Sequence, residues 1–322
     1  MAVCVATAFP PVEPCKSCQE NEYPSPMKDK CLKKMVVLLQ WYDGFAIVLA
    51  VFDLTGIIIT LLIGVLFARH LNTPVVKGAG GNLCFLTLLS LLASFSSIWM
   101  FIGKPTQLTC QIGLPLFGIS FALCVSCILA NLFQIFVGFS FDVMINENLK
   151  KLNKPVLIVM VCTGVQVSLC VLWLTLDPPT ANENTDKEIT ILLECTTGSK
   201  EAFGAVLLYI AVLAIICFLF AFKGKHLPDL YKNAKFITIS MLIYLSVWIL
   251  FIPVYINTSG EYLGAIKGAA ILVSNYSILC CHFGPKCYII IFKKKINVEN
   301  VIVEYIRKHY ENKGIQAVTS KT

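Results

Sequence analysis

The sequence predicts an all-α membrane protein, a seven-transmembrane helix bundle preceded by the end of a small disulfide-rich stalk. Hydrophobic residues make up 57% of the chain and charged residues only 14%, whereas soluble domains usually carry about 25% charged residues. Seven apolar stretches each reach the roughly 20 residues that a helix needs to cross a hydrocarbon core of about 30 Å. These observations place the chain in a lipid bilayer.

Each apolar stretch is expected to be a helix, because the bilayer core holds no water to satisfy exposed backbone groups. The spans cover residues 45–68, 82–102, 109–139, 155–176, 202–222, 236–256 and 263–283. Around them lie a remnant of an extracellular stalk (1–42), the membrane domain (43–292) and a cytoplasmic tail (293–322). Apolar residues at helical spacing in 298–306 predict a short helix on the membrane surface. Gly113, Gly118 and Gly164 are expected to let neighbouring spans approach closely.

The distribution of Lys and Arg predicts the orientation of the spans. With the N-terminus outside, most basic residues fall in inner segments, and the outer loop 177–201 is acidic. We therefore expect a multi-pass plasma-membrane protein with an extracellular N-terminus. The net charge of +7 then belongs to the inner membrane surface, and no nucleic-acid partner is expected. This basic inner surface comprises Lys77, Lys150, Lys151, Lys154, Lys223, Lys225 and Lys235.

The 15 cysteines divide between the spans and the segments outside them. Those inside the spans are interpreted as small apolar packing residues. Cys110 and Cys195 lie on the outer, oxidising side and could form a disulfide. Cys15, Cys18 and Cys31 follow the spacing C-x2-C-x12-C. A zinc site would lack its remaining ligands there, so the end of a disulfide module is favoured.

The first residues of the chain do not have the sequence pattern of a secretory signal peptide. Residues 1–10 lack a basic segment and lead directly into Pro-rich sequence. A protein with an extracellular N-terminal module normally needs such a leader or inserts through its first span. We therefore expect the chain to be a fragment, or the product of a gene model that lacks upstream exons.

Several motifs in a fixed order resemble the class C G-protein-coupled receptors. They are CKSCQENEYPSPMKDKCL before the first span, NTPVVKGAGGNLCFL in the first inner loop, SCILANLFQI in span three and CHFGPKCYIII at the end of span seven. The last contains the family's PKCY motif, Pro285, Lys286, Cys287 and Tyr288. ECTTGSKEAFG and FITISMLIYLSVWILFIPVYI are most similar to the group-six amino-acid-sensing branch and its vomeronasal and taste relatives.

The resemblance implies a modular receptor. In this family a two-lobed extracellular domain closes on an amino-acid-like ligand, and a cysteine-rich stalk transmits that closure to the membrane domain of a homo- or heterodimer. Inner loops then engage a heterotrimeric G protein. The two-lobed domain is not in this chain. An amino-acid-like ligand would therefore act on this chain only through that separate domain. The resemblance also implies a Cys110–Cys195 disulfide, closing a loop of about 85 residues, and a Cys18–Cys31 disulfide in the stalk.

Two positions depart from the family together. Asn131 and Asn233 stand where many members carry a basic residue in span three and a Glu before span six, the partners of an inner ionic lock. Charged partners that are replaced together leave little net cost, so one hypothesis is a neutral Asn131–Asn233 contact that forms a weaker lock. The alternative is two amides in solvated loops with no shared role.

Asp53 and Lys267 are the conspicuous charges inside the spans, where an unpaired charge costs several kcal/mol. The family often carries Glu at the position of Lys267. Lys267 either reaches Asp53 or extends its ammonium to the outer interface. The resemblance further suggests an allosteric pocket, although packing alone also explains its aromatic members. The candidates are Trp248, Lys267, Phe117, Phe121, Tyr244 and Tyr276.

The predicted function is that of a receptor membrane domain, which transduces amino-acid or chemosensory ligand binding to heterotrimeric G proteins. One alternative is a truncated, non-signalling or modulatory dimer partner. Another is a polytopic transporter, although the sequence shows no internal repeat of the kind that many transporters have. The spans hold no paired carboxylates, no H-E-x-x-H and no G-x-S-x-G, and the four histidines do not cluster. No enzyme activity, cofactor or metal is expected.

Overall fold

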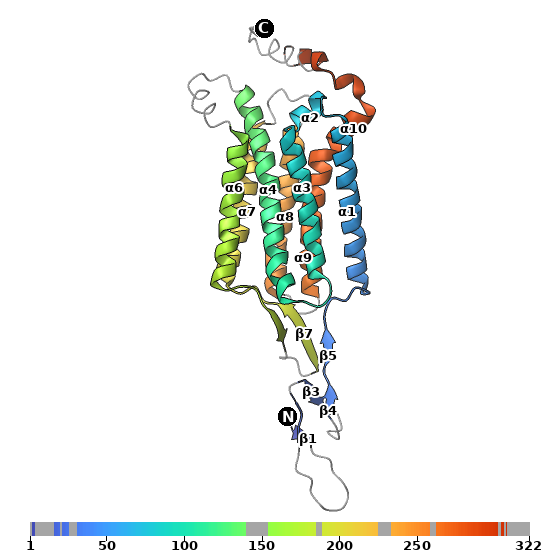
Figure 1. Cartoon of the computed structure of the whole chain (residues 1–322), viewed down its shortest axis with the longest axis vertical. Helices are drawn as coiled ribbons and strands as arrows, with labels where there is room; N and C mark the ends of the chain where they lie inside the picture. The colour runs from blue at the N-terminus through green and yellow to red at the C-terminus, as the bar shows by residue number, and fades with distance from the viewer. Residues whose placement is uncertain are drawn as a thin grey trace, which may run out of the picture.

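The spans form one helix bundle, with short strands projecting from one end of it (Figure 1). The computed structural model describes residues 2–3, 16–19, 21–25, 31–139, 154–184, 189–224, 233–257, 262–301, 304–305 and 307. Within these residues, seven helical stretches are long and apolar enough to cross a membrane. The predicted fold class is therefore confirmed.

The long helices follow the predicted spans closely. They are α1 (Gly44–Arg69), α3 (Asn82–Ser96), α4 (Gln107–Phe139), α6 (Pro155–Leu176), α7 (Lys200–Gly224), α8 (Asn233–Asn257) and α9 (Tyr262–Ile278). Shorter segments complete the bundle: α2 (Pro74–Gly78), the 3₁₀ turns η1 (Ser97–Phe101) and η3 (Lys294–Ile296), the π-helical turn η2 (Leu279–Phe283) and α10 (Gly284–Phe292).

The seventh span is longer than the sequence predicts. The apolar stretch ends at Phe283, but the helix widens through η2 and continues as α10 to Phe292. Pro285 does not stop it, because Pro285 lies in the first turn of α10, where its missing N–H and fixed φ cost little. Beyond α10, residues 299–301, 304, 305 and 307 are helical, in line with the predicted tail helix.

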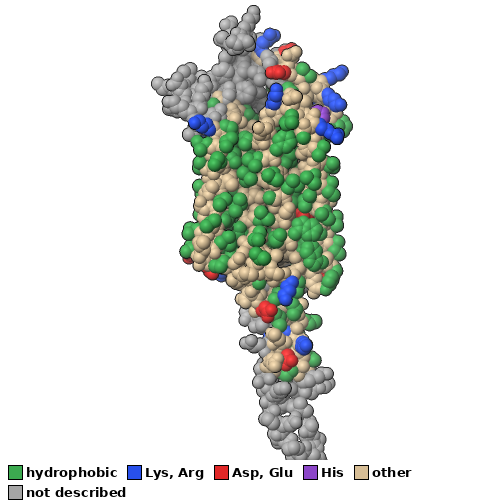
Figure 2. All heavy atoms as spheres, viewed as in Figure 1, with side chains coloured by type: hydrophobic (Ala, Val, Ile, Leu, Met, Phe, Trp, Pro, Cys, Tyr) green, Lys and Arg blue, Asp and Glu red, His purple; other side chains and the backbone are tan. Residues whose placement is uncertain are grey.

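The outer surface of the bundle is apolar over its middle and charged toward the ends (Figure 2). Large side chains such as Leu62, Met160 and Leu208 are more than 60% exposed, as expected for a surface solvated by lipid chains. The core is instead centred on α4, which packs against α3, α6 and α7. Most of α4 is buried, so this helix is the axis of the bundle.

Strands connect the stalk to the loop before α7, which keeps the name outer loop from its predicted position, and the sequence analysis did not anticipate this arrangement. β5 (Met35–Val37) pairs in parallel with β7 (Thr190–Cys195), which pairs antiparallel with β6 (Ala181–Asn184). Further out, β3 (Glu22–Pro24) pairs with β4 (Cys31–Lys33), and β1 (Ala2–Val3) pairs with β2 (Lys16–Ser17). The segment before the first helix and the loop before α7 thus share one sheet.

The glycines predicted to permit close helix contact do so in two of three places. A Cβ on Gly113 would lie 3.1 Å from Met100, and one on Gly118 would lie 3.1 Å from Gln166. The prediction is wrong for Gly164, where a Cβ would meet nothing within 4 Å because this residue faces outward. The tightest approach of a glycine between two helices is at Gly56 of α1, which packs on the ring of Phe95 in α3.

Replacing Gly56 by Ala is expected to lower the free energy of unfolding by about 1–3 kcal/mol, because overpacking displaces neighbours. The new methyl group would lie 2.5 Å from the ring of Phe95, which is fully buried. Gly164→Ala is the matched control and should be neutral or stabilising by roughly 0.5–1 kcal/mol through helix propensity. Thermal unfolding in detergent measures both; equal melting temperatures would contradict the close packing of α1 on α3.

Candidate functional site

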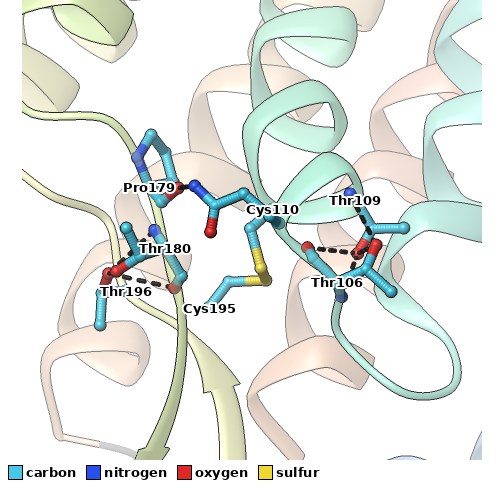
Figure 3. The surroundings of a disulfide bond; sticks show 8 residues. Thr106, Thr109, Cys110, Pro179, Thr180, Cys195 and Thr196 are labelled. Carbon is cyan, nitrogen blue, oxygen red and sulfur yellow. Dashed lines mark hydrogen bonds between the residues drawn. A yellow bond between two sulfur atoms is a disulfide. The ribbon is translucent and has the colours of Figure 1, made fainter.

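A disulfide fastens the outer loop to the central helix (Figure 3). Cys110, in the first turn of α4, is bonded to Cys195, the last residue of β7, and their Cα atoms lie 5.4 Å apart. Beside this bond the hydroxyls of Thr180 and Thr196 lie 2.8 Å apart, and Thr196 Oγ1 accepts from the Thr180 amide at 3.1 Å. The disulfide therefore holds the loop over the end of the bundle, and the threonine contacts brace the loop itself.

The stalk is attached to this disulfide-bonded loop and to the adjoining end of the bundle through backbone hydrogen bonds. Met35 N donates to Ile189 O at 3.1 Å where β5 joins β7, and Gly103 N donates to Leu39 O at 2.8 Å. Within the stalk Cys18 and Cys31 are disulfide-bonded, while Cys15 lies outside the described residues. A continuous path thus leads from the stalk through β5, β7 and the disulfide into α4.

Four of the predicted pocket residues come together as a packed aromatic stack. The rings of Phe117 and Trp248 stack with centroids 5.4 Å apart, and those of Phe121 and Tyr244 stack at 4.4 Å. Trp248 Nε1 also donates to Ser274 Oγ at 3.2 Å, which ties α8 to α9. The rings stack in the space between α4 and α8, which is the packing that the sequence left open beside a pocket.

Tyr276, also a predicted pocket candidate, does not belong to this stack. Its hydroxyl donates to Phe52 O of α1 at 2.7 Å, and its ring meets Phe95 edge-on at 5.7 Å. The helical rotation of α9 directs Tyr276 toward α1 and α3, whereas Ser274 faces α8. Two residues of separation are enough to place them on different sides of a helix.

Lys267 and Asp53 do not form the hydrogen-bonded pair that was one hypothesis. Both side chains are buried, at 6% and 0% exposure, but neither carboxylate oxygen of Asp53 has a hydrogen-bond partner. The Trp99 indole approaches this carboxyl without the geometry of a hydrogen bond. Lys267 instead lines a small cavity of about 60 Å³ under the linker and the outer loop, together with Leu39 and Cys195. It is therefore enclosed at the stalk end of the bundle, and the alternative that its ammonium extends to the outer interface stays a prediction.

Asn131 contacts the first inner loop. Its Nδ2 donates to Gly78 O at 3.4 Å, and the side chain is 4% exposed. The turn that receives it contains Gly80, whose φ of 102° suits glycine and whose missing Cβ leaves room for the Asn131 amide. The hypothesis of a solvated amide is wrong for Asn131. The side chain of Asn233, its predicted partner, lies outside the described residues.

The PKCY motif contains a buried cation that sequence reasoning did not explain. Lys286 Nζ lies 3.1 Å from His282 Nε2 and 5.9 Å from the centre of the Phe283 ring, and Lys286 is 1% exposed. His282 was missed, although its spacing of four residues from Lys286 in a helix was a usable signal. Pro285 lies in the first turn of α10, Cys287 is a half-buried free thiol and Tyr288 is exposed.

Basic residues gather at the end of the bundle opposite the stalk (Figure 2). The described members of the predicted inner surface, all exposed, are Lys77, Lys154, Lys223 and Lys235. Lys150, Lys151 and Lys225 lie outside the described residues. Through the part of the chain that the structure describes, no group of three or more His, Cys, Asp or Glu side chains could hold a metal ion.

A larger cavity, of about 1070 Å³, lies between α7 and α8 at the stalk end of the bundle. Of the aromatic stack, only Tyr244 and Trp248 line it. Its other lining residues include Asp177, Lys200, Phe203, Leu208 and Ile252. Two of the predicted pocket residues, Tyr244 and Trp248, thus line a cavity that lies beside the stack.

Comparison with known proteins gives one consistent result. Residues 39–286 match the family model described as the 7 transmembrane sweet-taste receptor of 3 GCPR. The chain is 46% identical over 303 residues to "G-protein coupled receptor family C group 6 member A" of Carassius auratus, covering 92% of this chain and 34% of that protein. The Homo sapiens protein of the same name is 46% identical, with 91% of this chain and 32% of that protein covered.

The "Extracellular calcium-sensing receptor" of Homo sapiens is 41% identical over 270 residues, which are 83% of this chain and 25% of that receptor. The chain therefore spans between a quarter and about a third of the length of these curated relatives. The matched region is the helix bundle with its adjoining linker.

Replacing Cys195 by Ser is expected to destabilise the bundle by about 4 kcal/mol, because the disulfide with Cys110 closes a long loop. Changing both cysteines to Ser should cost no more than the single change, since either removes the same bond. Cys280→Ser, at an exposed free thiol, is the control and should leave stability unchanged. Thermal unfolding of the purified variants measures these stabilities. A double variant much less stable than either single variant would contradict a bond shared by the two cysteines.

Proposed function

The chain belongs to the class C family of G-protein-coupled receptors, and we propose that it is the membrane domain that passes ligand binding to a heterotrimeric G protein. The ligand would be of amino-acid or chemosensory type and would bind a two-lobed extracellular domain outside this chain. Its relatives bear names of G-protein-coupled and calcium-sensing receptors. Membership of this family favours a receptor over the transporter considered from sequence.

The observation that carries the proposal is the path from stalk to central helix. A pull or twist on the stalk reaches β7 through the β5–β7 hydrogen bonds and reaches α4 through the Cys110–Cys195 bond. Because α4 is packed on three neighbouring helices, it cannot shift at the outer end without disturbing them. At its other end, α4 holds the first inner loop through Asn131.

We place the stalk on the extracellular side and the basic end in the cytoplasm, in line with the bias of Lys and Arg toward cytoplasmic loops. The exposed lysines Lys77, Lys154, Lys223 and Lys235 would face anionic lipid and the G protein. A homo- or heterodimer of class C chains at the plasma membrane is the proposed working assembly. The amide of Asn131 would replace the ionic lock of the family with a neutral hydrogen bond to Gly78 O.

To test coupling, the chain is fused behind the extracellular part of the Carassius auratus relative, and ligand-stimulated nucleotide exchange on purified G protein is measured. We expect exchange in the fused receptor, and a severalfold loss when Lys223→Glu and Lys235→Glu reverse charge on the inner surface. Lys104→Glu, at an exposed residue between η1 and α4, is the control and should not affect exchange. No exchange from a well-folded, surface-expressed fusion would favour a modulatory partner instead.

The neutral lock gives a second expectation in the same fusion. Asn131→Ala removes the bond to the inner loop, worth about 1 kcal/mol, and should raise ligand-independent exchange up to about fivefold. Ser126→Ala is the matched control, because the buried Ser126 hydroxyl donates within its own helix, to Ala122 O at 2.6 Å, and does not contact the inner loop. Equal basal exchange in both variants would mean that Asn131 has no role in holding the resting state.

A further inference from the structure

We propose that the crevice between α7 and α8 is a binding site for a zwitterionic phospholipid, whose acyl chain fills the hollow while its head group lies at the stalk end. The site is distinct from the aromatic stack, which occupies the interior between α4 and α8. Lipid binding itself does not depend on G-protein coupling. The proposed orientation decides only that the stalk end, where the head group lies, faces the outer leaflet.

The crevice opens toward the lipid-facing surface of the bundle. Among its lining residues, Leu208 of α7 is 65% exposed and Ile252 of α8 is 47% exposed, whereas Tyr244 and Trp248 behind them are buried. A hollow with exposed apolar side chains at its rim and buried rings at its floor admits a chain from the side. It is closed to the interior because the floor rings stack against Phe117 and Phe121.

The size and the walls of the crevice suit a hydrocarbon chain. Its volume of about 1070 Å³ lies just above the range for small-molecule sites, about 300–1,000 Å³. Leu207, Leu208, Phe251 and Ile252 supply aliphatic and aromatic walls. Gly204 also lines it, and a Cβ there would meet nothing within 4 Å. Such apolar walls gain dispersion contacts only when the hollow is filled.

The charges at the stalk end of the crevice select the head group. Asp177, which follows α6, and Lys200, which begins α7, both line this end and are both exposed. A phosphate beside the Lys200 ammonium and a quaternary ammonium beside the Asp177 carboxylate satisfy both charges at once. A purely anionic head group would be attracted by Lys200 and repelled by Asp177. The geometry therefore favours a phosphocholine head over a free fatty acid or an acidic lipid.

The test uses the full chain in nanodiscs that contain phosphatidylcholine with a photoreactive diazirine on one acyl chain. Crosslinked peptides are expected to concentrate on residues 203–211 of α7 and 244–252 of α8. Gly204→Phe and Ala211→Phe each place a ring in the crevice and should lower this labelling about tenfold, which corresponds to about 1.4 kcal/mol of binding. Gly164→Phe is the matched control, since Gly164 is exposed on α6 with open space beside it, and it should leave labelling unchanged.

Head-group choice is tested by competition. Excess unlabelled phosphatidylcholine should displace the probe, whereas oleate and phosphatidylserine should displace it poorly. The double variant Asp177→Asn with Lys200→Gln should remove this head-group preference and leave labelling by the acyl chain in place. This variant adds no ring to the crevice, so it tests the proposal even where a Phe variant fails to fold. The proposal is overturned if labelling spreads evenly over α1 and α6, if the folded Phe variants label like the wild type, or if oleate competes best.

Discussion

Every part of this molecule depends on one constraint, that backbone polar groups in the bilayer core must be satisfied by the chain itself. The constraint selects helices, and it also governs polar side chains within them. Thr60 donates to Gly56 O at 2.7 Å and Ser126 to Ala122 O at 2.6 Å, each within its own helix. Polar groups that bridge helices are therefore informative, because each joins elements that the bilayer alone would leave free to slide.

At the stalk end, three segments far apart in the sequence become one mechanical unit. The linker strand β5 and the loop strand β7 share backbone hydrogen bonds, and the Cys110–Cys195 bond continues the connection into α4. A disulfide restricts motion in a way that a hydrogen bond does not, so in the proposed function it would pass displacement of the stalk on to the helix. The central position of α4 would then spread that displacement through the bundle.

In the interior, the packed aromatic stack and the large hollow are two separate features. Aromatic rings from α4 and α8 stack closely against each other, and a large hollow lies beside them, between α7 and α8. Trp248 belongs to both, since it stacks on Phe117 and also lines the hollow. A molecule in the crevice would therefore touch the same ring that holds α8 against α4 and, through Ser274, against α9.

The sequence by itself determined the seven spans and the receptor family, because length and hydropathy are set locally by the thickness of the bilayer and the family motifs are contiguous. Only the tertiary structure decided which buried polar groups meet. Asn131 turns to Gly78, Lys267 is enclosed under the outer loop apart from Asp53, Tyr276 faces α1, and the hollow lies outside the aromatic stack. Those outcomes depend on how each helix is rotated and tilted against its neighbours, and side-chain packing among all the helices at once sets that rotation.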